Sequence, residues 1–133
     1  MKMKTIHSPK VITPVPATKS NCKVYNGQIF VSGMTARGLD GKVPEGMYAQ
    51  TRALFQKMKD LVEAAGGKMD DLIQINIFVT EMKVDEFWKA RREFFTGDFP
   101  CSTFVQVAAL ATPELKVEVN AIGFIGAGGT QPG

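Results

Sequence analysis

The feature that most constrains this chain is a long amphipathic helix pattern followed at once by a strand pattern. From Met47 to Ala65, apolar residues recur at three-to-four spacing, and the pair Gly66-Gly67 then supplies a left-handed stop. From Ile73 to Val79, apolar residues take every second position, as in a half-buried strand. Together the two patterns predict a helix packed on one face of a β-sheet.

The remaining segments complete a mixed sheet with two helices. Asn26-Gly27 is a strong hairpin signal between two short strands, because both residues tolerate positive φ. A second helix is expected from about Asp85 to Phe95, and further strands from Thr103 to Ala108 and from Lys116 to Phe124. The order ββαβαββ predicts an α+β fold, a two-layer sandwich with both helices on one face of a mixed β-sheet.

Length and cysteine content fit one domain inside a cell. The chain has 133 residues, enough to bury a core, and we expect residues 1–125 to form the domain and residues 126–133 to be a disordered tail. Cys22 and Cys101 lie far apart without metal-type spacing, which favours free thiols in a reducing compartment. Because His7 is the single histidine, we predict no metal site, and nothing indicates a cofactor.

Charge and hydropathy set the expected location and partners. The basic N-terminus leads into no continuous apolar stretch, and no run approaches membrane-spanning length, so a cytoplasmic protein without membrane contact is expected. The net charge is only +3 and the basic residues are dispersed among acidic ones. A nucleic-acid partner is therefore not predicted.

The sheet face away from the helices combines polar and apolar residues. This mixture suits a subunit interface with wet clefts at its margins, while an ordinary solvated sheet face is the alternative. The residues expected there are Gln74, Asn76, Phe78, Phe104, Gln106, Glu118, Asn120 and Ile122.

The segment from Phe99 to Ala108 resembles the active-site strand of the Rid family (RidA/YjgF, reactive-intermediate imine deaminases). In that family Pro-Ala-Arg-Ser leads into an apolar strand, and here Ser102 stands at the place of the arginine. The resemblance covers nearly the whole chain, through segments that match in order: Phe30–Gly33, Gln50–Arg52, Glu63–Gly67, Phe78–Met82, Phe94–Phe95, Val105–Ala108 and Val117–Val119. On this basis the chain is identified as a divergent Rid family member that lacks the catalytic arginine.

The resemblance implies a chorismate-mutase-like fold and a homotrimer with three ligand-binding clefts between subunits. It also implies hydrolysis of an enamine or imine to a 2-oxo acid, with the arginine on the substrate carboxylate and a glutamate assisting the attacking water. Ser32 and Gly33 of the family pattern are retained. Lys19, however, replaces a tyrosine, and Asn120 replaces the glutamate.

Further departures fall in the same expected cleft. Trp88 takes a helix position where an asparagine commonly faces the cleft, and Cys101 replaces an alanine. Losing the arginine removes a charged hydrogen bond of about 1.5 to 3 kcal/mol, and an amide at Asn120 cannot act as a general base. The ligand-binding residues that this comparison selects, with no catalytic residue assigned, are Lys19, Ser32, Gly33, Trp88, Cys101, Ser102, Thr103 and Asn120.

Each unusual residue also has a plain structural interpretation. Lys19 is either a transplanted cation for an anionic ligand or a solvated surface lysine. Trp88 is either an aromatic wall for a planar ligand or a packed helix residue. Cys101 is interpreted as a pocket-lining thiol, since no base or cation is known beside it, and Ser102 and Thr103 either donate hydrogen bonds to the ligand or cap the strand.

The sequence therefore predicts a divergent RidA-like protein that binds a small planar metabolite in clefts between subunits. As an enzyme it would be a hydrolase, a deaminase of an unusual enamine or imine, and a poor 2-iminopropanoate deaminase. The alternative is a non-catalytic sensor or interaction protein on the same trimeric scaffold. A ribonuclease is less favoured, because the charge is dispersed and the general base is missing.

Overall fold

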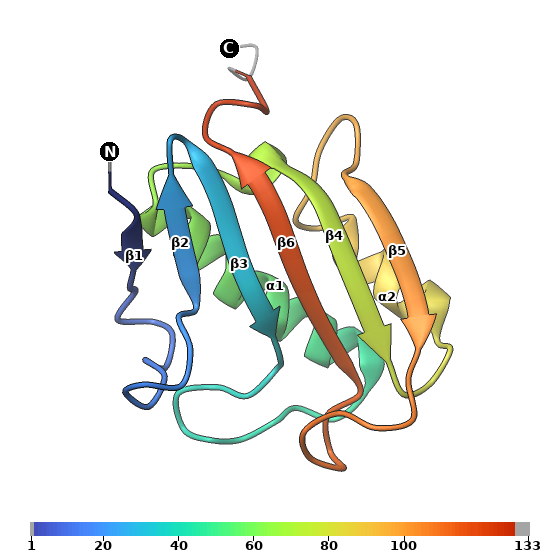
Figure 1. Ribbon diagram of the computed structural model, residues 1–133. Helices are drawn as coiled ribbons and strands as arrows, with labels where there is room; N and C mark the ends of the chain where they lie inside the picture. Colours follow the sequence, from blue (N-terminus) through green and yellow to red (C-terminus); the bar gives the residue numbers. More distant parts are fainter. Residues whose placement is uncertain (1, 130–133) are drawn as a thin grey trace.

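The computed structural model describes residues 2–129 and contains one six-stranded sheet with two helices on one face (Figure 1). The helices are α1 (Met47–Ala64) and α2 (Val84–Arg91), with a short 3₁₀ turn η1 (Met69–Asp71). The strands are β1 (Lys4–Ile6), β2 (Cys22–Tyr25), β3 (Gln28–Met34), β4 (Leu72–Val79), β5 (Cys101–Gln106) and β6 (Val117–Phe124).

The strand order is β1-β2-β3-β6-β4-β5, in which β4 and β5 are parallel and all other neighbours are antiparallel. The predicted two-layer α+β sandwich with a mixed sheet is thus confirmed. The structure adds β1, a three-residue edge strand next to β2. Asn26 and Gly27 both have positive φ, as the predicted hairpin between β2 and β3 requires.

The core lies between the helices and the sheet. Phe55 of α1 is fully buried and contacts three other aromatic rings, with Phe95 edge-on at 5.5 Å between ring centroids. Phe95 follows α2 instead of belonging to it, because the helix ends at Arg91 and the chain turns inward. Each large apolar side chain buried in this layer contributes about 1.5 to 3 kcal/mol.

The strand register decides which residues face away from the helices. Asn76 lies opposite Asn120 on that open face, as predicted. Phe104 was expected there too, but it pairs with the buried Ile77 and its ring lies 5.2 Å from that of Phe87 in α2. The prediction was wrong because alternation along β5 directs Phe104, and with it Gln106, toward the helix side.

One register shift also changes the predicted pattern of β4. The pairing with β6 is irregular between Leu72 and Gln74, so Leu72 is buried while Ile73 is 52% exposed. Beyond this point the alternation follows the sequence, and Ile75 is fully buried.

The chain after β6 folds back toward η1. The backbone N–H of Gly128 donates a hydrogen bond to Oδ1 of the buried Asp71 at 2.8 Å. Residues 130–133, the end of the predicted disordered tail, lie outside the described residues. Between residues 2 and 129, no helix is both long and apolar enough to cross a lipid bilayer.

Candidate functional site

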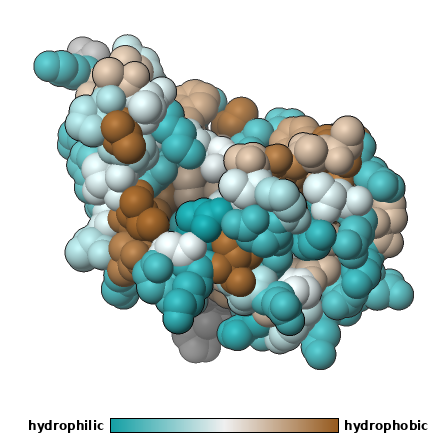
Figure 2. All heavy atoms as spheres, turned by 90° about the horizontal axis from the view of Figure 1, so that it is seen from below, coloured by the Kyte–Doolittle hydropathy of each residue, from teal (hydrophilic) through white to brown (hydrophobic). Residues whose placement is uncertain are grey.

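Two cavities adjoin at Ser32 and Gly33, near the end of β3. The open-face cavity, of about 670 Å³, lies on the sheet face away from the helices and includes Asn76, Asn120 and Ile122. The loop cavity, of about 480 Å³, includes Lys19, Arg37, Lys57 and Glu118. Figure 2 views the end of the molecule where the loops after β3 and β5 lie, and it shows a hollowed surface with hydrophobic and hydrophilic side chains side by side.

A β-bulge positions the two shared residues. The pairing of β3 with β6 shifts between Val31 and Met34, so Ser32 and Gly33 lie where the ladder is interrupted. The Ser32 hydroxyl donates to the backbone oxygen of Ser20 at 2.5 Å, which ties the bulge to the loop before β2. The two retained residues, Ser32 and Gly33, thus lie where the backbone is accessible from both cavities.

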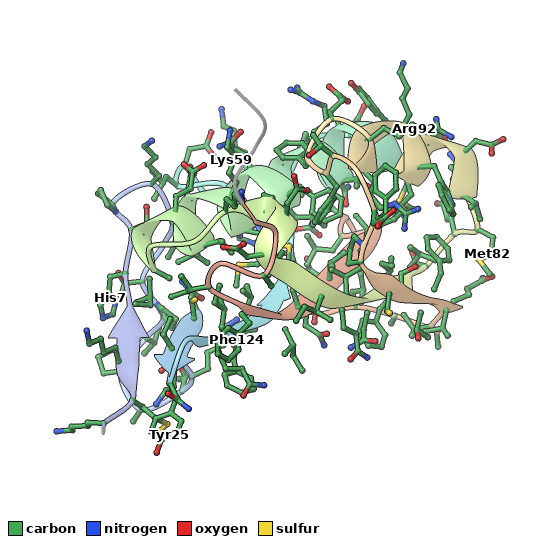
Figure 3. All side chains as sticks on the ribbon, turned by 90° about the horizontal axis from the view of Figure 1, so that it is seen from above. His7, Tyr25, Lys59, Met82, Arg92 and Phe124 are labelled. Carbon is green, nitrogen blue, oxygen red and sulfur yellow. The ribbon has the colours of Figure 1, made fainter. Side chains whose placement is uncertain are left out.

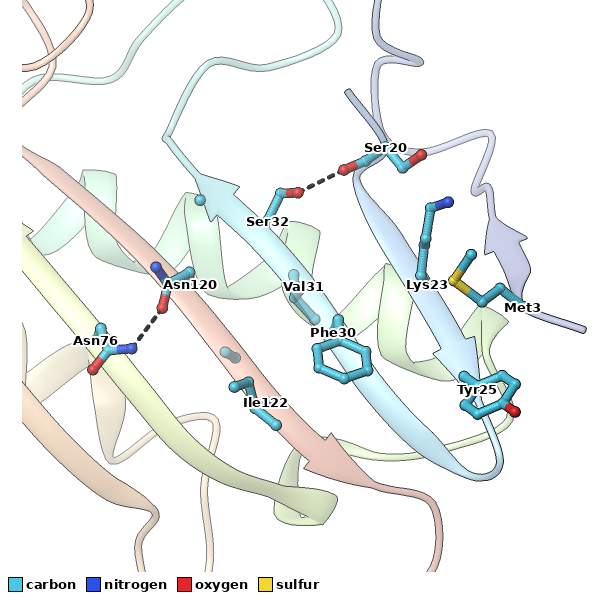
Figure 4. A pocket seen from close by; sticks show the side chains of 12 residues that line it. Met3, Ser20, Lys23, Tyr25, Phe30, Val31, Ser32, Asn76, Asn120 and Ile122 are labelled. Atoms are coloured by element: carbon cyan, nitrogen blue, oxygen red, sulfur yellow. Dashed lines mark hydrogen bonds between the residues drawn. The ribbon is translucent and has the colours of Figure 1, made fainter. Parts of the chain in front are cut away.

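The open-face cavity has an amide floor and an aromatic side. Asn76 Nδ2 donates to Asn120 Oδ1 at 2.9 Å across neighbouring strands (Figure 4). Phe30 and Tyr25 line the cavity from β3 and β2, and both are more than 40% exposed. Figure 3 shows Tyr25 and Phe124 projecting from the sheet on the side opposite the helices, whereas Lys59 and Arg92 lie on the helix side. A face this apolar is unusual for a surface in contact with water alone.

The absence of a side chain at Gly33 leaves room for a carboxylate beside it. A Cβ atom at Gly33 would lie 2.3 Å from Oε2 of Glu118, far inside van der Waals contact. The Glu118 carboxylate forms no ion pair or side-chain hydrogen bond with any of residues 2–129. Sequence reasoning placed Glu118 on the open face without assigning it to the site, and the structure places it at the loop cavity.

The loop cavity is basic. Lys57 Nζ donates to the backbone oxygens of Thr35 and Arg37, at 2.9 and 3.0 Å. Burial, and then the positive charges of Lys19 and Arg37, lower the pKa of Lys57 to about 8. The Arg37 guanidinium is already paired with Glu114 at 2.8 Å, so Lys19 and Lys57 are the cations of this cavity without a carboxylate partner in the described chain.

Lys57 was missed from the sequence, although a signal was present. It lies three residues after Leu54 and four before Leu61, on the apolar stripe of α1. A lysine at that position must direct its amine to the edge of the core, where it needs acceptors. The loop carbonyls of residues 35 and 37 supply these acceptors, which no local pattern reveals.

The other predicted ligand residues form a second group on β5 and α2. Cys101 and Thr103 pair with Gln74 and Asn76, so they share the open face of the sheet. Ser102 points to the opposite side, where its hydroxyl lies 3.4 Å from Nη1 of Arg91. Both Cys101 and Ser102 are exposed.

Trp88 and Cys101 are exposed, whereas Cys22 is buried. Trp88 is 39% exposed, and its ring centroid lies 3.7 Å from the Arg91 guanidinium carbon, so it is not a core residue within one chain. Cys22 is buried, which raises the pKa of its thiol to about 11, whereas Cys101 is exposed.

The predicted site residues are thus divided within a single chain. Lys19, Ser32, Gly33 and Asn120 line the two adjoining cavities. The other four, which line neither cavity, are Trp88, Cys101, Ser102 and Thr103.

Fold and site together define a small α+β protein with a ligand-sized cavity on the open face of its sheet. A family model described as Endoribonuclease L-PSP matches residues 12–125, and the chain therefore belongs to that family, which is the Rid/YjgF family.

Three relatives illustrate the similarity. The chain is 35% identical over 106 residues, 77% of its length and 78% of the relative's, to the 2-iminobutanoate/2-iminopropanoate deaminase of Escherichia coli K12. A crystal structure of a protein of unknown function from Pseudomonas aeruginosa is 32% identical, with a TM-score of 0.85 over 93% of both chains. RidA from an Antarctic Psychrobacter species is 26% identical, with a TM-score of 0.84 over 92% of this chain and 99% of that one.

Proposed function

We propose that this chain forms a homotrimer that binds a small planar metabolite in clefts between subunits, in the cytoplasm. The observation that carries the proposal is the pair of adjoining cavities at Ser32 and Gly33. Together they offer exposed backbone, the Asn76–Asn120 amide pair, and two lysines without a carboxylate partner among residues 2–129. An anionic ligand suits Lys19 and Lys57, and a flat one suits the aromatic side of the open-face cavity.

In this proposal, a second copy of the chain completes each cleft. The residues of β5 and α2 that resemble the Rid site line neither cavity of their own chain, so they can complete a cavity only on a neighbour. The open face offers exposed apolar side chains for such contact, including Tyr25, Phe30 and Phe124. Light scattering in solution tests the assembly: a mass three times the chain's 14.5 kDa is expected, and a monomer would contradict it.

The reaction that fits best is hydrolytic deamination of an imine or enamine other than the small 2-imino acids. Water adds to the C=N carbon, and loss of ammonia leaves the 2-oxo acid. Asn120 cannot take the water's proton, but the Glu118 carboxylate beside Gly33, which has no ion-pair partner among residues 2–129, can. The E. coli relative is named for its action on 2-iminobutanoate and 2-iminopropanoate.

Incubation with 2-iminopropanoate generated in situ tests this proposal. Without a strand arginine on the substrate carboxylate, we expect ammonia release to be about tenfold to a hundredfold slower than with the E. coli relative assayed in parallel. Release at the relative's rate would contradict the claim that the usual activity is weakened.

A non-catalytic sensor on the same scaffold is the second candidate, favoured by the Asn76–Asn120 amide pair where a carboxylate would support hydrolysis. A cleft ligand that stays chemically unchanged for many hours would favour it.

Ribonuclease activity, suggested by the family's description, is third because the charge is dispersed. RNA cleavage that disappears on further purification would exclude it, and cleavage abolished by a cleft mutation would support it.

A further inference from the structure

Arg91, the last residue of α2, is a buried arginine without an acidic partner. It is only 3% exposed, and no carboxylate of residues 2–129 forms an ion pair with it. Its Nε is buried and has no hydrogen-bond partner in the described chain. Among residues 2–129, the one hydrogen bond of its guanidinium to a side chain is the long bond from Nη1 to Ser102 Oγ, at 3.4 Å.

The surroundings of Arg91 compensate only part of this desolvation. Its guanidinium carbon lies 3.7 Å from the ring centroid of Trp88 and 5.1 Å from that of Phe99, which gives two cation–π contacts. The C-terminal end of α2 adds partial negative charge from its carbonyl groups. Burial, together with the nearby charge of Arg92, lowers the pKa of Arg91, yet a guanidinium keeps its proton at neutral pH. A buried full charge is stabilised best by an anion.

The position of Arg91 is as informative as its burial. Ser102 lies on β5, an edge strand of the sheet, and its side chain is exposed. Trp88 and Phe99 are 39% and 43% exposed, so both rings offer surface to a ligand. An anion at the Ser102 hydroxyl would lie next to the guanidinium, which itself contacts both aromatic rings.

We infer that the Arg91 cluster, consisting of Trp88, Arg91, Phe99 and Ser102, recognises the carboxylate of a planar, conjugated acid. The guanidinium and the Ser102 hydroxyl donate to the carboxylate, while the conjugated plane packs on Trp88 or Phe99. A flat carboxylate matches the planar donor array of arginine. The inference rests on the proposed function, because it places the ligand's carboxylate at the strand position where the Rid arginine is absent, with the charge supplied from the helix.

The chain contains a single tryptophan, so intrinsic tryptophan fluorescence reports on this cluster alone. Titration of the full chain with benzoate, a planar carboxylate, is expected to change Trp88 emission saturably. Benzamide, its neutral analogue, should bind at least tenfold more weakly, since one charge-assisted interaction is lost. Equal responses to benzoate and benzamide, or no response to millimolar benzoate, would overturn the inference.

Two variants at the exposed Ser102 avoid disturbing the core. Ser102→Glu places a carboxylate next to Arg91 within the chain, and Ser102→Gln is its neutral control. We expect Ser102→Glu to abolish benzoate binding and to raise the thermal midpoint above that of Ser102→Gln. Benzoate binding of equal strength in the two variants would contradict a role for the Arg91 charge.

Removing the charge itself completes the test. Arg91→Met retains much of the side-chain length, and we expect at least a tenfold loss of benzoate affinity. If this variant does not fold, the comparison of Ser102→Glu with Ser102→Gln tests the inference on its own. Trimer mass and imine hydrolysis are measured separately. If the protein is a monomer and its benzoate affinity depends on Arg91, the proposed cleft alone is contradicted. If the protein is a trimer and Arg91→Met leaves its benzoate affinity unchanged, this inference alone is contradicted.

Discussion

The side-chain amides of Asn76 and Asn120 form a hydrogen bond of 2.9 Å across β4 and β6, with Asn76 as the donor. The bond uses the oxygen of Asn120 and leaves the NH₂ group of that residue to donate within the open-face cavity. The site therefore presents a hydrogen-bond donor at the place where the family resemblance predicts a carboxylate.

Asn120→Glu tests whether this exchange limits hydrolysis. The new carboxylate would accept the Asn76 hydrogen bond and could take a proton from water, so we expect at least a tenfold gain in ammonia release from 2-iminopropanoate, a modest part of the usual effect of a general base. Asn120→Gln, which adds length without charge, is the control and should leave the rate unchanged. Equal rates in both variants would show that proton transfer does not take place at this residue.

Lys19→Met should abolish binding of small anions such as 2-oxobutanoate to the loop cavity while leaving the oligomer intact. The reason is that Lys19 is exposed and lines the cavity without a carboxylate partner in the described chain. Isothermal titration measures the affinity, and Lys10→Met, another exposed lysine, is the matched control. Unchanged affinity in Lys19→Met would show that Lys19 is a solvated surface lysine without a role in binding.

Lys57 gives a pH-dependent stability. Its folded-state pKa of about 8 lies below the ordinary value of 10.5, so the unfolded chain binds more protons between these two pH values. The free energy of unfolding contributed by this group should therefore rise with pH from about 8 to 10.5. Urea denaturation at several pH values should show this rise in the wild type and a smaller one in Lys57→Met. Parallel curves would contradict the lowered pKa.

Gly33→Ala should displace the Glu118 carboxylate, because the new Cβ atom would lie 2.3 Å from Oε2 of this flexible side chain. Displacement of Glu118 should also weaken ligand binding at the adjoining cavities. Gly38→Ala is a suitable comparison, since its nearest contact is the flexible end of Asp40 at 3.1 Å. The affinity of the two alanine variants for 2-oxobutanoate would be compared by isothermal titration, and equal affinity would refute the displacement of Glu118.

The two thiols should differ in reactivity. Iodoacetamide is expected to modify Cys101 of the native protein and to spare Cys22, which is buried and whose thiol has a pKa of about 11. Mass spectrometry after brief exposure distinguishes the two positions, and denatured protein should be modified at both. Modification of Cys22 at the rate of Cys101 in native protein would contradict its burial.

Most of the fold could be predicted from local sequence patterns. The hairpin at Asn26-Gly27 and the helix from Met47 follow from turn chemistry and from apolar spacing, and both are found in the structure. The direction of Phe104 could not be predicted, because it depends on the parallel register between β5 and β4, which pairs residues 27 positions apart in sequence, such as Ile77 and Phe104.

Only some of the residues that line the candidate cavities could be predicted, for a similar reason. Ser32, Gly33 and Asn120 were located by resemblance, and the structure brings them to one cavity. Lys57 and Arg91 were missed because their importance lies in what surrounds them: loop carbonyls in one case, and two aromatic rings without an acid in the other. Apolar spacing indicates that both residues lie near the inner side of their helices, but it does not reveal which groups meet the charge there.

The hydrogen bond from Gly128 to the buried Asp71 bears on how the C-terminus can be shortened. Asp71 Oδ2 also accepts from the backbone N–H of Lys68, so this carboxylate joins the turn after α1 to the segment after β6. Truncation at residue 125, where the family match ends, would remove one of these donors and leave a buried oxygen without it. The glycine-rich segment after β6 thus fixes the turn after α1 to the sheet. A chain cut at residue 125 would therefore have a lower free energy of unfolding than the 133-residue chain.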